Sequence, residues 1–149
     1  GKELVINGVG IRKATFLKIK VYYGALYLSE KTTNPNAFLG NSDPKQIVMH
    51  FVRDVSVTDL KKTYREAFEA SNKETYKNLL PSLEAFNANL SDIKKDERMI
   101  ITFLADGATL TFIGKTFPKV GDAAFSKALL NMYFINPLDQ GLTNGLLGL

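Results

Sequence analysis

The sequence contains no cysteine, a single histidine and no long apolar run. Without cysteine, disulfides, thiol nucleophiles and thiolate metal sites are excluded, whereas the compartment is not decided. No apolar run reaches the length of a membrane span. His50 has no neighbouring nucleophile and no second histidine at ligand spacing, so we expect a structural role for it.

Charge of either sign is spread along the chain. The formal net charge is +4, and acidic residues flank the basic doublets Lys61-Lys62 and Lys94-Lys95. No arginine-rich tract or basic-aromatic repeat occurs, so we expect no nucleic-acid partner. The mild positive charge is compatible with weak attraction to anionic membrane surfaces or anionic ligands.

Motifs for metals and cofactors are also missing. Asp92, Asp96 and Glu97 lack the spacing of a calcium loop, and we expect no metal site. Gly8-x-Gly10 lacks the third glycine and the following helix of a dinucleotide fingerprint. We therefore interpret the two glycines as turn geometry and expect no cofactor.

The chain has 149 residues, of which 45% are hydrophobic, and we expect one domain, 1–149, with a substantial core. Two-residue periodicity predicts strands before residue 54 and again after residue 97. Asn7-Gly8 is interpreted as a turn and Asp106-Gly107 as a hairpin turn. The predicted strands are Glu3 to Ile6, Val9 to Phe16, Leu17 to Leu28, Gln46 to Arg53, Arg98 to Ala105 and Ala108 to Ile113.

The period changes to that of a helix after Ser56, which we expect to cap the first helix. A second helix is expected to start in a box-like segment at Ser71, a third to run from Asp122 to about Ile135, and a short one to occupy Leu138 to Leu147. A short helical turn is expected around Ala37. The order of these elements along the chain is strands, a helix pair, a hairpin and further helices. This order predicts an α+β domain, with an open antiparallel sheet and helices layered on one face.

Arg12 is the most informative residue for function. It follows Gly8-Val9-Gly10-Ile11 in an apolar strand, and a buried arginine costs several kcal/mol unless an anion or an acceptor faces it. Arg12 is therefore a candidate anchor for a carboxylate or an enolate. Two other interpretations stay open: a snorkelling arginine, and an arginine that pairs with an internal acid.

Four segments of the sequence are informative when they are taken together. The first is Gly8-x-Gly10-x-Arg12 followed by a strand that ends at Tyr27-Leu28. The others are Phe51-Val52-Arg53-Asp54-Val55, Asn136-Pro137-Leu138 and Gly145-Leu146-Leu147-Gly148. In this order and spacing they resemble the chalcone isomerase-like superfamily, in particular its bacterial branch. The resemblance extends almost from end to end and implies the open-sheet fold predicted above. It also implies a periplasmic or secreted protein whose signal has been removed; a cytoplasmic location is not excluded.

The resemblance implies two kinds of site. The isomerases combine the arginine with a threonine on the next strand and a Tyr-x-x-Lys pair on a helix. Here the threonine position falls at Tyr22, and Tyr76-Lys77 are adjacent, so they point about 100° apart. A non-catalytic branch binds fatty acids and keeps the arginine with a tyrosine in place of the threonine, as in Arg12 with Tyr22.

We therefore expect a non-enzymatic protein that binds a small apolar carboxylate, such as a fatty acid, in a cleft between sheet and helices. The expected ligand-binding residues are Arg12, Tyr22 and Tyr76, with Tyr23 as the substitute for Tyr22 if the strand register differs, and no catalytic residue is assigned. Tyr22 shares strand parity with Lys18 and Lys20, so either its face looks into the cleft or a bulge near Gly24 resets the register. The alternatives are a structural or protein-interaction module and, third, an isomerase or lyase that uses Arg12 and a tyrosine.

Overall fold

The strands form one antiparallel sheet in which neighbours in the sequence are neighbours in space. The computed structural model describes residues 3–14 and 18–149. In this part of the chain the sheet order is β1-β2-β3-β4-β5-β6. The strands are β1 (Val5–Ala14), β2 (Ile19–Leu28), β3 (Lys45–Phe51), β4 (Arg98–Leu104), β5 (Gly107–Phe112) and β6 (Lys115–Thr116). The predicted junction between the first two long strands lies at residues 15–17, outside the described residues.

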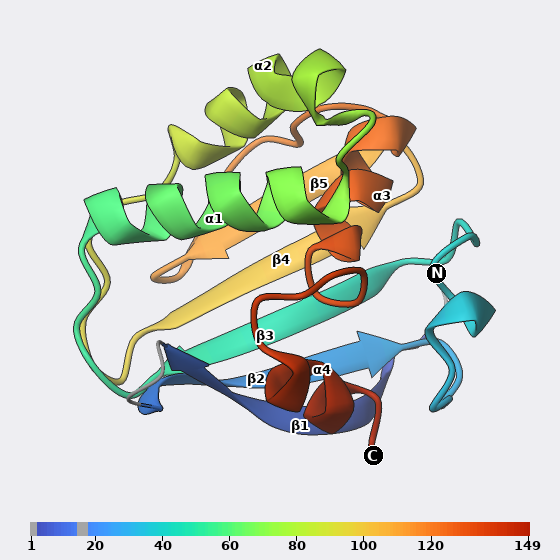
Figure 1. The fold of residues 1–149 in the computed structure, drawn as a ribbon, viewed down its shortest axis with the longest axis horizontal. Coiled ribbons are helices and arrows are strands. Elements are labelled where there is room, and N and C mark those ends of the chain that lie inside the picture. Colours follow the sequence, from blue (N-terminus) through green and yellow to red (C-terminus); the bar gives the residue numbers. More distant parts are fainter. Residues whose placement is uncertain (1–2, 15–17) are drawn as a thin grey trace.

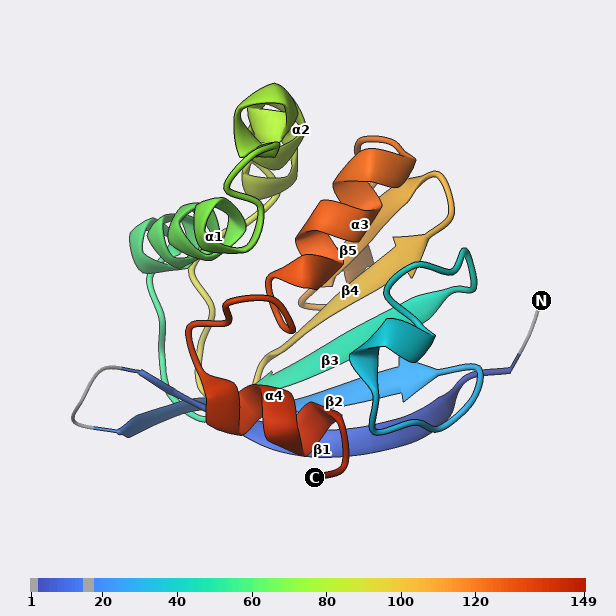
Figure 2. The same ribbon diagram turned by 45° about the vertical axis from the view of Figure 1, so that its right-hand side comes forward.

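The helices cover one face of this sheet (Figures 1 and 2). The pair α1 (Val57–Ser71) and α2 (Tyr76–Asn87) connects β3 to β4, and α3 (Ala123–Asn131) and α4 (Gln140–Leu146) follow β6. A 3-10 turn, η1 (Pro35–Ala37), stands at the expected place. This arrangement confirms the predicted α+β fold. None of the helices in the described ranges combines the length and apolarity that a bilayer crossing requires.

The core fills the space between the sheet and the helices. In β3 every second side chain is buried, as the alternation predicts, and Ile47, Met49 and Phe51 face the helices. Phe68 of α1 and Phe125 of α3 belong to the same core and pack on each other, with ring centroids 5.9 Å apart. Burial of this apolar core stabilises the packing of the helix layer on the sheet.

Of the expected starts of the first three helices, two are confirmed. The Ser56 side chain accepts from the Asp59 N–H, and Asp122 accepts from the Phe125 N–H. The expected start at Ser71 is wrong, because α1 runs through Ser71. The side-chain amide of Asn72 donates to the carbonyls of Phe68 in α1 and of Ala128 in α3, so it does not cap a new helix. The second helix, α2, begins at Tyr76. The third helix ends at Asn131, earlier than expected.

The predicted turn at Asn7-Gly8 is wrong, because both residues lie inside β1. Asn7 has no partner in β2, so it forms a bulge that bends the strand. Its side chain ties together three segments: it accepts from the Thr32 N–H at 2.8 Å and donates to the carbonyls of Thr32 and Leu146, each at 2.9 Å. The turn-forming dipeptide therefore serves as an anchor for the chain end.

A backbone-to-backbone contact places α4 on β1. A Cβ atom added to Gly10 would lie 2.5 Å from the Leu142 carbonyl oxygen, and one added to Gly145 would lie 2.4 Å from Gly10 Cα. A Cβ atom added to Gly8 would lie 2.2 Å from the Gly145 carbonyl oxygen. The glycines therefore permit a close approach that no other residue allows.

We expect Gly145→Ala to destabilise the protein by up to about 3 kcal/mol, because the added methyl group meets backbone atoms that cannot rotate away. At an open helical site the same change would stabilise by about 1 kcal/mol, so the sign of the effect is diagnostic. Gly40→Ala, in the turn after η1, is the control for an added methyl group without a clash, since nothing lies within 4 Å of its added Cβ, and it should change stability little. Urea unfolding of the three proteins measures both effects, and equal stability of Gly145→Ala and the parent would contradict the contact.

Candidate functional site

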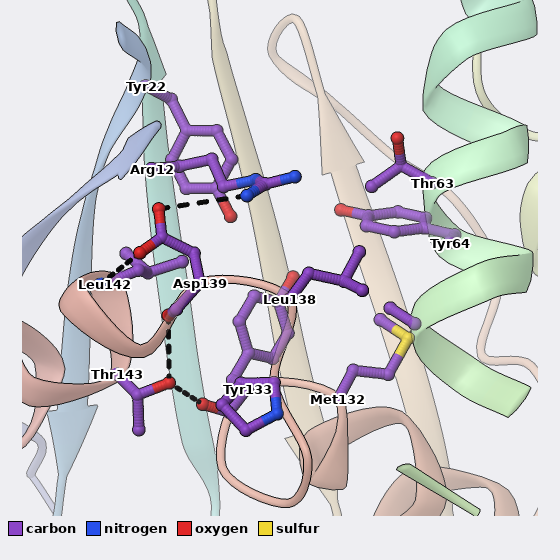
Figure 3. Close-up of a pocket in the computed structure, with 12 residues that line it drawn as sticks. Arg12, Tyr22, Thr63, Tyr64, Met132, Tyr133, Leu138, Asp139, Leu142 and Thr143 are labelled. Atoms are coloured by element: carbon purple, nitrogen blue, oxygen red, sulfur yellow. Dashed lines mark hydrogen bonds and ion pairs between the residues drawn. The ribbon is translucent and has the colours of Figure 1, made fainter. Parts of the chain in front are cut away.

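Arg12 and Tyr22 stand directly opposite each other on β1 and β2. Directly opposite residues of an antiparallel pair point to the same face, and here that face is the one beneath the helices. Tyr22 is 9% exposed, and the Arg12 side chain is 16% exposed. The register therefore brings together the two residues that the sequence singled out (Figure 3).

The parity problem of Tyr22 is resolved by a bulge, but not at the expected position near Gly24. Lys20 pairs with Lys13 and Tyr22 pairs with Arg12, so Val21 is the extra residue. Val21 packs against the core, as Tyr22 does. Lys20 thus lies on the opposite face from Tyr22, although the two residues are only two positions apart.

The N-terminus of α4 adds a carboxylate beside Arg12. Asp139 Oδ1 accepts from the Leu142 N–H at 3.1 Å and caps the helix, and Oδ2 accepts from the Lys13 N–H at 2.7 Å. Arg12 Nη1 lies 3.8 Å from Oδ2, which is beyond hydrogen-bond distance. Asp139 is therefore oriented by two backbone N–H groups and only loosely paired with the guanidinium.

Most of the hydrogen-bonding capacity of Arg12 remains unused. Its Nη1 donates to the Lys13 carbonyl at 2.9 Å, and the other N–H groups of its five-donor guanidinium find no acceptor in residues 3–14 and 18–149. The guanidinium faces the pocket in Figure 3. A cation with free donors at 16% side-chain exposure is arranged for an anionic or strongly accepting ligand.

Three buried phenols surround this position: Tyr22, Tyr64 of α1, and Tyr133, which follows α3. Tyr64 and Tyr133 donate to the Met49 sulfur at 3.8 and 3.9 Å, and thioether sulfur is a weak acceptor. Burial raises the pKa of all three phenols, and for Tyr22 the nearby Arg12 charge only partly opposes this. The hydroxyls are thus neutral donors at physiological pH.

The remainder of the pocket is mainly apolar. It has about 40 Å³ of free space, which holds a few water molecules. Thr143 is turned away from any ligand, because its hydroxyl donates to the Tyr133 carbonyl at 2.6 Å. The other lining residues are Thr63, Ala67, Met132, Pro137, Leu138 and Leu142.

The structure separates the expected site residues into two groups. Arg12 and Tyr22 line the pocket; Tyr23 is 40% exposed on the opposite face, and Tyr76 stands at the start of α2 beside Glu69, outside the lining. Sequence reasoning missed Asp139, although an aspartate two residues after Pro137, at the start of an expected helix, is a helix-cap pattern. Helical spacing does not separate a core residue from a pocket residue, so the sequence alone does not mark Tyr64 and Tyr133 as pocket residues.

We expect Tyr64→Phe to change how the unfolding free energy depends on pH, because burial raises the pKa of the Tyr64 phenol. Above pH 10 the unfolded chain loses a proton that the folded chain keeps, so the unfolding free energy falls by about 1.4 kcal/mol per pH unit for each such tyrosine. Tyr64→Phe should make this fall shallower by about that amount. At neutral pH it should change stability by less than about 1 kcal/mol, since it removes only weak bonds to sulfur.

Urea unfolding of parent and Tyr64→Phe at pH 7 and at about pH 11 measures both quantities. The difference between the two proteins isolates Tyr64 from the lysines, which titrate in the same range. An equally steep alkaline fall in both proteins would contradict a raised pKa.

Comparison with known proteins agrees with this architecture. A family model described as chalcone isomerase-like matches residues 1–148. No curated protein sequence matches the chain. The crystal structure of a fatty-acid binding protein of Arabidopsis thaliana superposes with a TM-score of 0.75 at 16% identity, covering 99% of this chain and 88% of that one. At this identity the superposition speaks for the fold alone; with the family match, the chain belongs to the chalcone isomerase-like family.

Proposed function

We propose that this protein binds a fatty acid or a similar apolar carboxylate, with the carboxylate on Arg12 and Tyr22. The observation that carries the proposal is the Arg12 guanidinium, which lies under the helices with most of its donors free and directly opposite a neutral phenol. A guanidinium offers a planar fork to a carboxylate, and the phenol adds a further donor.

The charges of the pocket favour a monoanion. Arg12 is the one cation and Asp139 the one anion among its lining residues. Both oxygens of Asp139 already accept backbone N–H groups, so it is satisfied without Arg12. A carboxylate can approach the free donors of Arg12 from the pocket side, whereas a doubly charged phosphate would add a second charge beside Asp139 with no cation to balance it.

The acyl chain requires the pocket to widen, and its surroundings are suited to this. All three methionines of the chain are at this place: Met132 lines the pocket, and the sulfurs of Met49 and Met99 contact the Tyr64 hydroxyl. Methionine has three rotatable bonds and adapts to irregular shapes. When an apolar chain displaces these side chains, the hydrogen bonds that break are the weak ones from tyrosine hydroxyls to methionine sulfur.

The family supports this ligand class. The superposed Arabidopsis thaliana protein is named as fatty-acid binding. Tyr22 stands where the isomerases are expected to have a threonine, and on that ground we propose the non-catalytic branch. The bacterial branch is proposed on the motif resemblance alone. The periplasmic or secreted location stays a prediction.

A second candidate is a structural module without a small-molecule ligand. The ion pair between Arg12 and Asp139 favours it, because Arg12 would then serve to hold α4 on β1. The distance of 3.8 Å and the two other bonds of Asp139 make the pair a weak one. We therefore rank this candidate below ligand binding.

We expect Arg12→Ala to weaken fatty-acid binding by about 2–5 kcal/mol, because it removes the charged partner of a buried pair. Tyr22→Phe should lose less, since it removes one neutral donor. Arg12→Lys keeps the charge but not the planar fork, and should fall between Arg12→Ala and the parent. Calorimetric titration with medium-chain fatty acids measures the affinities, and thermal shift reports folding.

Asp139→Asn separates the two candidates. Asparagine can keep the cap of α4 and removes the negative charge beside Arg12, but its amide nitrogen cannot accept from the Lys13 N–H. Some loss of stability is therefore expected on either hypothesis, and fatty-acid affinity is the measurement that separates them. The ligand hypothesis predicts tighter fatty-acid binding by this variant. The structural candidate predicts lower stability of both Asp139→Asn and Arg12→Ala, with no saturable binding by the parent; that result would end the ligand hypothesis.

We expect no stereoselective chalcone cyclisation. Tyr22 and Arg12 are present, but Tyr76 and Lys77 lie outside the pocket lining, so the acid-base set of the isomerases is not assembled here. The assay compares flavanone formation with the spontaneous rate in buffer. A stereoselective rate above that background, abolished by Arg12→Ala, would favour the isomerase alternative.

A further inference from the structure

The face of the sheet opposite the helices is uncovered in the described chain (Figure 2). We call it the open face. Because paired residues share a face, the ladder pairs identify its side chains row by row. The rows are Lys13–Lys20; Ile11–Tyr23–His50–Arg98; Val9–Ala25–Val48–Ile100; and Ile6–Tyr27–Gln46–Thr102.

The middle of the open face is apolar and accessible. Val9 is 53% exposed, Ile6 45% and Tyr23 40%. Ile11, Ala25, Tyr27, Val48 and Ile100 surround them and are half-buried. A contiguous apolar area on a sheet, rimmed by polar residues, marks a contact surface.

One end of the open face is basic. Lys13 and Lys20 form one row, and Arg98 ends the next. None of these three side chains forms an ion pair with a described residue, whereas the neighbouring His50 meets Asp96 at 3.3 Å. The six strands contain no Asp or Glu at all, so the acidic residues of the chain stand in the helices and loops.

We propose that the open face docks on an anionic lipid surface. Cations at one end and apolar side chains in the middle complement a bilayer whose headgroups are negative and whose interior is apolar. Tyr23 between them has the amphipathic ring that suits the headgroup level. A second copy is disfavoured as the occupant, because two open faces brought together offer no strand carboxylate to either set of cations.

This surface is independent of the proposed ligand pocket. Arg12 and Tyr22 point to the helix face, and Lys13 and Tyr23 point away from it. Arg12→Ala should therefore keep vesicle binding, and loss of docking should leave fatty-acid titration unchanged. The two proposals can fail separately.

The test is flotation of the full chain with vesicles of phosphatidylcholine alone, and of phosphatidylcholine with about one third phosphatidylglycerol. We expect binding to the second kind only, weakened by high salt. The triple variant Lys13→Glu, Lys20→Glu, Arg98→Glu should lower affinity by at least about a hundredfold, because each basic residue near an anionic surface contributes about fivefold. Val9→Ser with Tyr23→Ser should weaken binding at both salt concentrations.

The matched control is Lys62→Glu, Lys73→Glu, Lys127→Glu, which gives the same net charge with all three exposed positions outside the strands. It should keep more binding than the open-face triple variant. Circular dichroism confirms that each variant folds. Equal loss in both triple variants, no vesicle binding by the parent, or a dimer in light scattering that the Val9 and Tyr23 changes dissociate would overturn the proposal.

Discussion

The contact between the glycines of β1 and the backbone of α4 is the constraint on which the rest of the site depends. Gly8 and Gly10 leave no side chain between strand and helix, and Gly145 does the same from the other side. The helix therefore lies close enough for its capping residue, Asp139, to reach both the Lys13 N–H and the neighbourhood of Arg12. Two segments from opposite ends of the chain thus meet and form one wall of the pocket (Figure 3).

This contact gives the pocket its electrostatic character. Asp139 is held by two backbone donors at a helix N-terminus, an arrangement that stabilises its negative charge without help from Arg12. Arg12 is consequently attracted to Asp139, but it donates no hydrogen bond to that carboxylate. The buried phenols around it have raised pKa values and keep their protons, so they offer donors and no competing negative charge. The pocket as a whole is therefore rich in donors and poor in acceptors.

The sheet divides two kinds of chemistry between its faces. Beneath the helices, Arg12 and Tyr22 form a polar point in an otherwise apolar environment. On the open face, the same strands present Lys13, Tyr23 and Val9 to the surroundings. The bulge at Val21 makes this possible, because it shifts Lys20 to the open face and keeps Tyr22 under the helices. The sheet, whose strands contain no Asp or Glu, can then present Arg12 and Tyr22 inward and cations outward from consecutive positions.

The sequence alone determined the fold class, because local periodicity decides it. It determined the starts of α1 and α3, because their caps are only a few residues long. It also indicated the pairing of Arg12 with Tyr22, because both residues are carried over from the family resemblance. It did not determine that Asn7 forms a bulge, that Asn72 bonds to carbonyls on two elements, or that Asp139 stands beside Arg12. Each of these depends on partners far away in the sequence. The same dipeptide or amide satisfies local and distant hydrogen bonds almost equally well, and only the packing of α4 and α3 on the sheet decides which partner is within reach.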